Sequence, residues 1–253
     1  MGRNIYVSPS GTARRVKALY VGTGSDVARR VIRAWVGDSN GIARLAYCDI
    51  PTNATLYGGY TEGGSFTYDG RTFSKNYGET SHNLTDLRLR NPSETIRVNY
   101  TSSWKNGYYD QVVTAGQATN LYACPEHTLY WHGIDGPNGF NYNAGDVVTT
   151  KYDNQFYIFR RDIYYTGVYS IYVQAVKNGT LNVRVSTLRN LVNPDYNRYY
   201  IRLGGLEYVA SSNTTYSRNV SAGDWVDIGV GVYMTDTGFS AEFELVIDAI
   251  WFE

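Results

Sequence analysis

The residues best suited to chemistry gather near the middle of the chain. Cys124 and His127 are followed by His132, and the remaining histidine is His82. Cysteine and histidine are zinc ligands, but a zinc site of the finger type needs a second Cys-x-x-Cys or His-x₃₋₅-His half, which this sequence lacks. We therefore expect His127 and His132 to flank a strand and a turn, with no metal bound.

A loop rich in oxygen-bearing side chains follows, and its composition raises calcium binding as a second chemistry. The loop runs from Asp135 to Asp146, with Pro137 and Gly139 at its third and fifth positions. An EF-hand needs oxygen ligands at both of those positions. The segment is therefore predicted to be a long turn.

Hydrolytic chemistry has little support in the sequence. Glycoside hydrolysis needs two carboxylates across a cleft, and the acids here are scattered, mostly in turns. Asp248 stands alone between Ile247 and Ala249 in an apolar strand, where we expect it to be hydrogen-bonded or to face outward. No Gly-x-Ser-x-Gly elbow is present, and the Gly-x-Gly at Gly22–Gly24 opens no dinucleotide-binding unit. We predict no enzymatic activity and no cofactor.

Aromatic side chains make recognition the better-supported role. The chain has 25 tyrosines, and exposed Tyr and Trp rings suit both sugar rings and protein partners. Neighbouring residues of a strand point to opposite faces, so one ring of each adjacent pair is expected in the core. The candidate ligand-binding residues are Tyr130, Trp131, Tyr164, Tyr196 and Tyr199.

The elements that must position these residues are strands. Tyr, Thr and Val favour strands, and the 26 glycines favour tight turns. The sequence predicts an all-β fold, with N-terminal short β-hairpin repeats followed by one or two β-sandwich or jelly-roll domains. The expected strands are Ser65–Tyr68, Leu84–Leu89, Thr95–Tyr100, Tyr108–Val113, Leu121–Ala123, Thr128–Trp131, Gln155–Phe159, Val168–Val176, Leu181–Thr187, Tyr199–Leu203, Trp225–Tyr233 and Ser240–Phe252.

The predicted domains follow from composition and turn signals. Residues 1–50 form a basic repeat segment for attachment and assembly. Residues 51–154 form a β-sandwich-like domain, and residues 155–253 form a C-terminal jelly-roll-like β-sandwich. One larger sandwich over residues 53–253 is the alternative.

The first segment repeats itself every 15 residues. Ala13-Arg14-Arg15-Val16 returns as Ala28-Arg29-Arg30-Val31, and Tyr20-Val21-Gly22 returns as Trp35-Val36-Gly37. The Gly-rich stretches 22–26 and 37–41 are strong turn signals, which favours hairpins over the alternative of amphipathic helices. Units this small cannot bury a core alone, so they are expected to stack on other surfaces. The expected assembly residues are Arg14, Val16, Tyr20, Arg29, Val31, Trp35 and Arg44.

Charge is divided unevenly along a chain whose formal net charge is zero. Residues 1–47 carry eight Lys/Arg and two Asp/Glu, whereas the rest carries 15 and 21. Such a division indicates a separate partner for the first segment. Nucleic acid is the less favoured partner, because the arginines have few aromatic stacking platforms beside them. An acidic protein surface fits the pattern at least as well.

Two further expectations concern the compartment. Cys48 and Cys124 leave a single disulfide open, but they form no disulfide framework. Residues 1–11 lack the apolar region of a signal peptide, and no apolar window is long enough to span a bilayer. We expect synthesis in a cytoplasm and no membrane partner.

The first segment resembles a short repeat of tail and virion proteins from bacteriophages and prophages of Gram-positive hosts. That repeat runs approximately (Tyr/Trp)-Val-Gly-x-x-Gly-Val-Ala-(Arg/Lys)-x-Val. It is matched by Tyr20-Val21-Gly22 with Val27-Ala28-Arg29-Arg30-Val31, and by Trp35-Val36-Gly37 with Gly41-Ile42-Ala43-Arg44. Ser25-Asp26 stands where Asn-Gly is usual. The resemblance covers about 45 residues.

The resemblance implies a structural virion protein made in the host bacterial cytoplasm. It would belong to the tail, the baseplate or a receptor-binding device, attached through its repeats, with projecting sandwiches that bind host-surface glycan. Its implied partners are other virion proteins and further copies of itself, with a trimer favoured. The alternatives are a capsid decoration or head-fibre protein, a free carbohydrate-binding module and a polysaccharide depolymerase.

Overall fold

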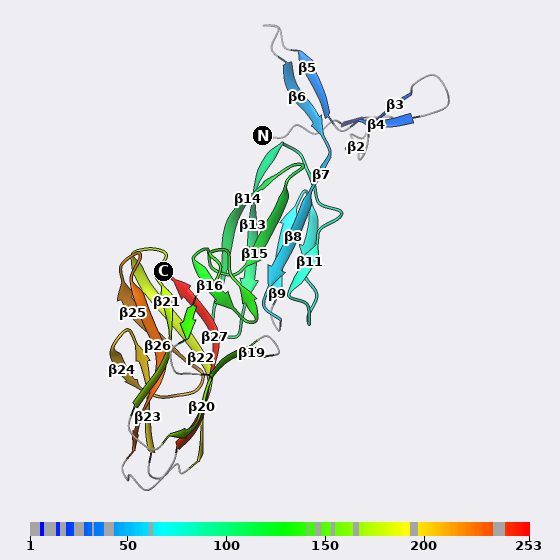
Figure 1. The fold of residues 1–253 in the computed structure, drawn as a ribbon. Coiled ribbons are helices and arrows are strands. Elements are labelled where there is room, and N and C mark those ends of the chain that lie inside the picture. The colour runs from blue at the N-terminus through cyan, green and yellow to red at the C-terminus, as the bar shows by residue number, and fades with distance from the viewer. Residues whose placement is uncertain are drawn as a thin grey trace.

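The protein is all-β in a computed structural model, as its sequence predicts (Figure 1). The structure describes residues 6–7, 14–15, 19–22, 28–31, 33–37, 43–60, 63–140, 142–144, 148–152, 155–163, 167–192, 197–234 and 241–253. These ranges contain no helix, and so none that is long and apolar enough to cross a membrane. Three parts follow one another along the chain: hairpins, a middle sandwich and a C-terminal sandwich.

The described residues of the N-terminal segment form three two-stranded antiparallel pairs. Tyr20 pairs with Arg30 in the second hairpin, and Trp35 pairs with Leu45 in the third. The strands end where the Gly-rich stretches begin, so the prediction of hairpins is confirmed and the helical alternative is wrong. The strands are β1 (Tyr6–Val7), β2 (Arg14–Arg15), β3 (Leu19–Gly22), β4 (Ala28–Val31), β5 (Arg33–Gly37) and β6 (Ala43–Cys48).

The middle sandwich packs a four-stranded sheet, β10-β9-β13-β14, against a three-stranded sheet, β11-β8-β15, with β7 and β12 as a short pair beside them. Alternating apolar residues place Ile96, Val98 and Tyr100 of β13 in its core. The strands are β7 (Ile50–Pro51), β8 (Asn53–Gly58), β9 (Gly63–Tyr68), β10 (Arg71–Ser74), β11 (Ser81–Asn83), β12 (Arg88–Leu89), β13 (Ser93–Thr101), β14 (Asn106–Thr114) and β15 (Ala118–Ala123).

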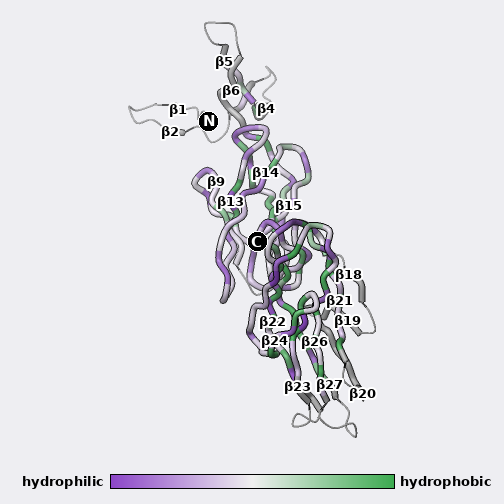
Figure 2. Tube along the Cα trace, turned by 90° about the vertical axis from the view of Figure 1, so that its left-hand side faces the viewer, coloured by the Kyte–Doolittle hydropathy of each residue, from purple (hydrophilic) through white to green (hydrophobic). Residues whose placement is uncertain are grey.

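The C-terminal sandwich has β27 at the centre of one sheet and β26 at the centre of the other. β27 pairs with β16 and β20 along one edge and with β22 along the other, and β25 lies beyond β22. The second sheet has the order β18-β21-β26-β23-β24. Hydrophobic segments follow the central strands of this sandwich (Figure 2).

The strands of the C-terminal part are β16 (Thr128–Trp131), β17 (Ile134–Asp135), β18 (Tyr142–Ala144), β19 (Val148–Tyr152), β20 (Gln155–Ile163), β21 (Gly167–Gln174), β22 (Gly179–Val192), β23 (Asn197–Leu203), β24 (Leu206–Val209), β25 (Thr214–Val220), β26 (Trp225–Met234) and β27 (Ala241–Phe252). Strand pairing changes from the middle sheets to the C-terminal sheets between β15 and β16. That change falls earlier in the chain than the predicted domain boundary at 154/155.

One expected strand is wrong over most of its length. Of the predicted strand Leu84–Leu89, only residues 88–89 are extended as β12. Leu84 and Leu87 lie in a turn, where the Leu87 amide donates to the Leu84 carbonyl over 3.1 Å. Both leucines are nevertheless buried in the core of the middle sandwich. The spacing of Leu84 and Leu87 therefore indicates that both side chains are buried, but not that the backbone between them is extended.

A one-residue bulge at Asp248 lets β27 serve both cores. Arg184 pairs with Ala249 and Val185 pairs with Ile247, so Asp248 has no counterpart on β22. Before the bulge Ile247 faces the C-terminal core, and after it Ile250 and Phe252 do so. Ala249 and Trp251 consequently turn toward the core of the middle sandwich.

Trp131 of β16 completes the joint between the two sandwiches. It belongs to the core of the middle sandwich, although its strand pairs with β27. Its ring lies 5.6 Å from Tyr100 and 6.0 Å from Trp251, both in edge-to-face geometry. The hydrophobic contact of these rings joins the two sandwiches.

We predict that Trp131→Ala lowers the free energy of unfolding by about 3–5 kcal/mol, because it leaves a large cavity in the joint. Guanidinium denaturation followed by circular dichroism measures the change. Tyr77→Ala is the control: its side chain is 79% exposed, and its effect should stay within about 0.5 kcal/mol. A loss below about 1 kcal/mol for Trp131→Ala would show that the joint contributes little to stability.

Candidate functional site

Tyr20 and Trp35 occupy equivalent places in two successive hairpins. Tyr20 is on β3 and Trp35 on β5, 15 residues later, and both open their strand's Tyr/Trp-Val-Gly motif. Their side chains are 56% and 53% exposed. Arg33 is also exposed, and it shares a strand face with Trp35 because the two are two residues apart. The repeat thus presents an aromatic ring at the same position twice.

The other expected assembly residues are described only in part. Arg14, Arg29 and Arg44 lie on β2, β4 and β6, and the structure describes their backbone alone. Val31 is half-buried on β4. Val16 lies outside the described residues.

The predicted ligand-binding pair Tyr130 and Trp131 is wrong, because both rings are buried. β16 lies between two cores, so its opposite faces both pack: Tyr130 against the C-terminal core and Trp131 against the middle core. Tyr199 is half-buried and packs on Phe243 at 6.1 Å between ring centroids. Tyr164 and Tyr196 lie outside the described residues. Of the described candidates, Tyr130 and Trp131 are therefore buried and Tyr199 is half-buried.

Cys124, His127 and His132, the possible metal ligands, lie in different environments. Cys124 is a free and fully buried thiol, whereas the His127 imidazole lies 3.9 Å from the Glu126 carboxylate near the surface. His132 forms the turn between β16 and β17 with a left-handed φ of 41°. In the described part of the chain, no three His, Cys, Asp or Glu side chains converge as a metal site would need. The loop considered for calcium is described only at 135–140 and 142–144.

His132 ties three segments together through its backbone. Its amide donates to the Asp248 carbonyl over 2.7 Å, and its carbonyl accepts from the Tyr60 amide over 3.1 Å. The Trp104 ring, from the loop after β13, packs 5.7 Å from the imidazole and 5.1 Å from Trp251. Histidine at positive φ costs free energy, and these contacts hold it there.

Asp248 is half-buried at the bulge of β27. Burial raises the pKa of its carboxyl above the usual value, and His132, Ser186 and Arg184 oppose that increase. Glycoside hydrolysis needs two carboxylates, and no acidic residue is among the described groups that act on the pKa of Asp248. Its environment is that of a structural residue.

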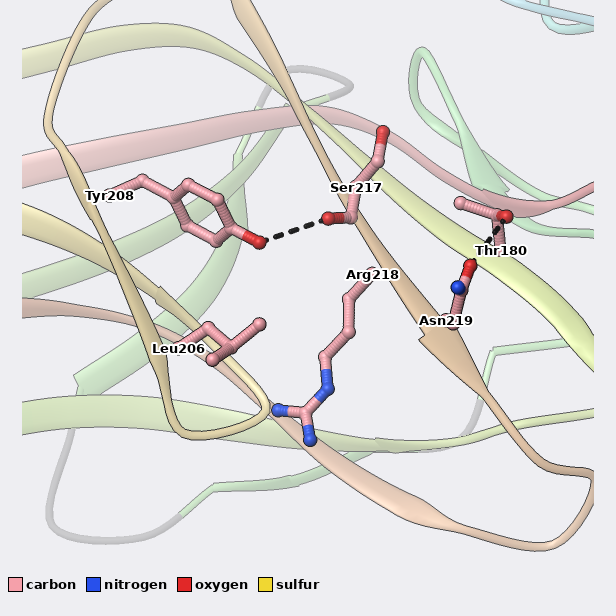
Figure 3. A pocket seen from close by; sticks show the side chains of 6 residues that line it. All are labelled: Thr180, Leu206, Tyr208, Ser217, Arg218 and Asn219. Carbon is pink, nitrogen blue, oxygen red and sulfur yellow. Dashed lines mark hydrogen bonds between the residues drawn. The ribbon is translucent and has the colours of Figure 1, made fainter.

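A shallow pocket of about 350 Å³ opens between the edge strands β24 and β25 of the two C-terminal sheets. Figure 3 shows the side chains of Tyr208, Leu206 and Arg218 around one opening, with Ser217 beside them. The Tyr208 hydroxyl donates to the Ser217 carbonyl over 3.1 Å, which ties β24 to β25. The lining residues are Thr180, Leu206, Tyr208, Ser217, Arg218 and Asn219.

Arg218 is fixed by the turn between β23 and β24. Its Nη1 donates to the Leu203 carbonyl over 3.0 Å. Gly204 has a φ of 56°, and a Cβ there would lie 2.1 Å from Arg218 Nη1. Only glycine therefore suits both the backbone and the approach of the guanidinium. Arg218 is not among the residues predicted from the sequence, and the Gly204-Gly205 pair is the signal that could have located the turn beside it.

The comparisons with known proteins assign this chain to no family. No protein-family model matches the sequence, and no curated protein matches it. Among solved structures, the chain is similar to the secreted serine protease VesC from Vibrio cholerae (14% identity, TM-score 0.26) and to a calcium-binding mutant of β-glucuronidase 2 from Bacteroides uniformis (9% identity, TM-score 0.24). Each match covers 79% of this chain, but only 44% and 29% of the other chain, respectively. The chain thus spans less than half of either protein, and TM-scores this low carry no functional argument.

We predict that Asp248→Asn is at least as stable as the parent protein at pH 7. When folding raises the pKa of a carboxyl, ionising that carboxyl lowers the free energy of unfolding of the protein. The loss develops as the pH rises from the pKa in the unfolded chain, about 3.9, through the higher pKa in the folded protein. The variant lacks this loss, so the two proteins should converge in stability as the pH falls and Asp248 becomes protonated. Urea denaturation across a pH series measures the difference. A variant more than about 1 kcal/mol less stable at pH 7 would show that Arg184 and His132 need the ionised carboxylate.

Cys124 should be inert in the folded protein. Burial raises the pKa of its thiol to about 12, against a weaker opposing effect of the Thr128 hydroxyl. Only the thiolate reacts, so Ellman's reagent at pH 8 should label the folded Cys48→Ser variant only after denaturant is added. Rapid labelling in native buffer would contradict the burial of Cys124.

Proposed function

We propose that this protein is a non-enzymatic structural component of a bacteriophage particle. Its N-terminal hairpins attach it, and its sandwiches project to bind host-surface glycan. The observation that carries the proposal is the repeated exposure of Tyr20 and Trp35, on hairpins whose sequence resembles virion repeats. The proposed location is the virion, in the tail, the baseplate or a receptor-binding device.

The hairpins support an attachment role because a two-stranded ribbon is marginally stable by itself. Each hairpin is a separate two-stranded sheet, and the described members of both hydrophobic cores begin only at Ala54. Burying the exposed rings of Tyr20 and Trp35 against a partner would supply apolar contact that stabilises the hairpins. The proposed partners are other virion proteins and further copies of this chain, with a trimer favoured.

Charge favours an acidic partner surface. The first 47 residues have six more basic than acidic groups, and exposed Arg33 lies on the same strand face as exposed Trp35. An arginine next to an aromatic ring is common at the centre of protein interfaces. The hairpins therefore combine apolar contact with a positive field.

The test is a Tyr20→Ser/Trp35→Ser double variant. We expect it to remain folded, because neither ring belongs to a core, but to lose incorporation into particles and to shift the purified protein toward monomer. Sedimentation measures the oligomer, and immunogold labelling of particles measures incorporation and distinguishes tail from head. An acidic interface also predicts that rising salt weakens assembly.

A matched control changes one tyrosine and one tryptophan that are exposed elsewhere. Tyr77→Ser/Trp225→Ser alters residues that are 79% and 50% exposed in the two sandwiches, and it should assemble normally. If the hairpin variant assembles like the parent, or if particles contain no copy of the protein, attachment through the hairpins is wrong.

A further inference from the structure

The guanidinium of Arg218 has N–H groups to spare at the pocket between β24 and β25. Its Nη1 donates to the Leu203 carbonyl, and among the described residues no carboxylate lies within ion-pair distance of it. A guanidinium carries five N–H donors in a planar fork. The fixed Nη1 therefore holds the group in place while other donors stay available to a ligand.

The other polar residues of the pocket add donors but no negative charge. Thr180 donates its hydroxyl hydrogen to Asn219 Oδ1 over 3.2 Å, which leaves the N–H groups of the Asn219 amide available. Ser217 donates to Asn182 Oδ1 over 2.7 Å. Of the six lining residues, Arg218 alone is charged. The pocket thus favours an anion with hydroxyl groups around it.

The single acidic residue of β24, Glu207, is turned away from the pocket. Glu207 stands between Leu206 and Tyr208 on β24, so it points to the opposite face. Its carboxylate lies 3.9 Å from Arg202 and 3.4 Å from the Tyr233 hydroxyl, and both of these residues belong to the β23–β26 side. The positive charge of Arg218 is therefore not neutralised from β24.

Apolar surface completes the pocket. Leu206 is 51% exposed, and the half-buried ring of Tyr208 is held by its bond to Ser217. A sugar ring has apolar C–H faces and polar edges, so a leucine, a tyrosine and an amide suit it together. The volume of about 350 Å³ is at the small end of ligand sites, which suits a single sugar-sized unit.

We propose that this pocket binds the anionic group of an acidic saccharide, with Arg218 recognising the charge and Leu206 and Tyr208 contacting the sugar ring. The proposal rests on the glycan-binding role proposed above but not on attachment through the hairpins. The shared ligand chemistry is an anion on a polyhydroxylated chain, which a uronic acid or a glycerol phosphate polymer can supply. Arginine pairs with carboxylate and phosphate alike through two parallel bonds.

Isothermal titration of the purified full chain tests the proposal with trigalacturonate and with a glycerol phosphate trimer. The methyl ester of trigalacturonate and free glycerol are the neutral counterparts. We expect at least one anionic probe to bind about tenfold more tightly than its neutral counterpart, and Arg218→Gln to remove that preference. The anionic probe that binds identifies the source of the charge.

Two further variants separate recognition from folding, because Arg218 also bonds to the Leu203 carbonyl. Asn219→Ala changes an exposed side chain and should weaken binding severalfold with unchanged thermal unfolding. Arg189→Gln is the matched control: its guanidinium is exposed and lies 3.4 Å from Glu244, away from the pocket. It should bind like the parent protein.

The proposal is overturned if no anionic probe binds, if the neutral counterparts bind equally well, or if Arg218→Gln and Asn219→Ala both bind like the parent. Shifts of the Leu206 and Asn219 amide resonances on titration would place a bound probe in this pocket, and shifts confined elsewhere would overturn it. None of these results depends on oligomer formation or on particle incorporation. Failure here is therefore distinguishable from failure of the attachment role.

Discussion

The bulge at Asp248 is the constraint on which the two sandwiches depend. An uninterrupted β27 would keep residues 243, 245, 247, 249 and 251 on one face, because side chains alternate along a strand. The extra residue reverses this alternation, so Ile250 continues the C-terminal core while Trp251 enters the middle one. One strand then contributes to both cores, and the sandwiches are joined by buried apolar surface.

The elements around the bulge follow from this arrangement. Trp131 lies between the cores because it pairs with Ala249, the first residue of β27 after the bulge. Both side chains face the core of the middle sandwich. The loop after β13 brings Trp104 onto Trp131 and Trp251, with ring centroids 5.2 and 5.1 Å away. Arg184 lies over the Trp104 ring at 5.4 Å, and Lys105 pairs with Glu253 at the rim. Three of the five tryptophans of the chain thus stabilise a single joint.

The sequence predicts the parts of the fold whose signal is local. Gly-rich turns and a 15-residue period locate the hairpins, and the alternation of apolar residues locates long strands such as β22 and β27. The candidate pocket was missed because β24 and β25 are edge strands: exposed Leu206 and Val209 and polar Ser217 and Asn219 leave them without an apolar alternation. Tyr130 and Trp131 were misjudged for a different reason. Alternation puts one of them on each face, but it cannot reveal that both faces of β16 are covered.

The two proposed surfaces differ in how much of their structure exists before binding. At the pocket, Gly204 admits the Arg218 guanidinium to the Leu203 carbonyl, and the Tyr208 hydroxyl bonds across to β25. A site fixed in this way loses little conformational entropy when it binds, which suits a small ligand that offers few contacts. In the described part of the hairpins the rings of Tyr20 and Trp35 are exposed and no residue belongs to either core, so a partner would have to supply the apolar contact that stabilises them. We therefore assign the proposed small-ligand recognition to the C-terminal edge and the proposed assembly role to the N-terminal repeats.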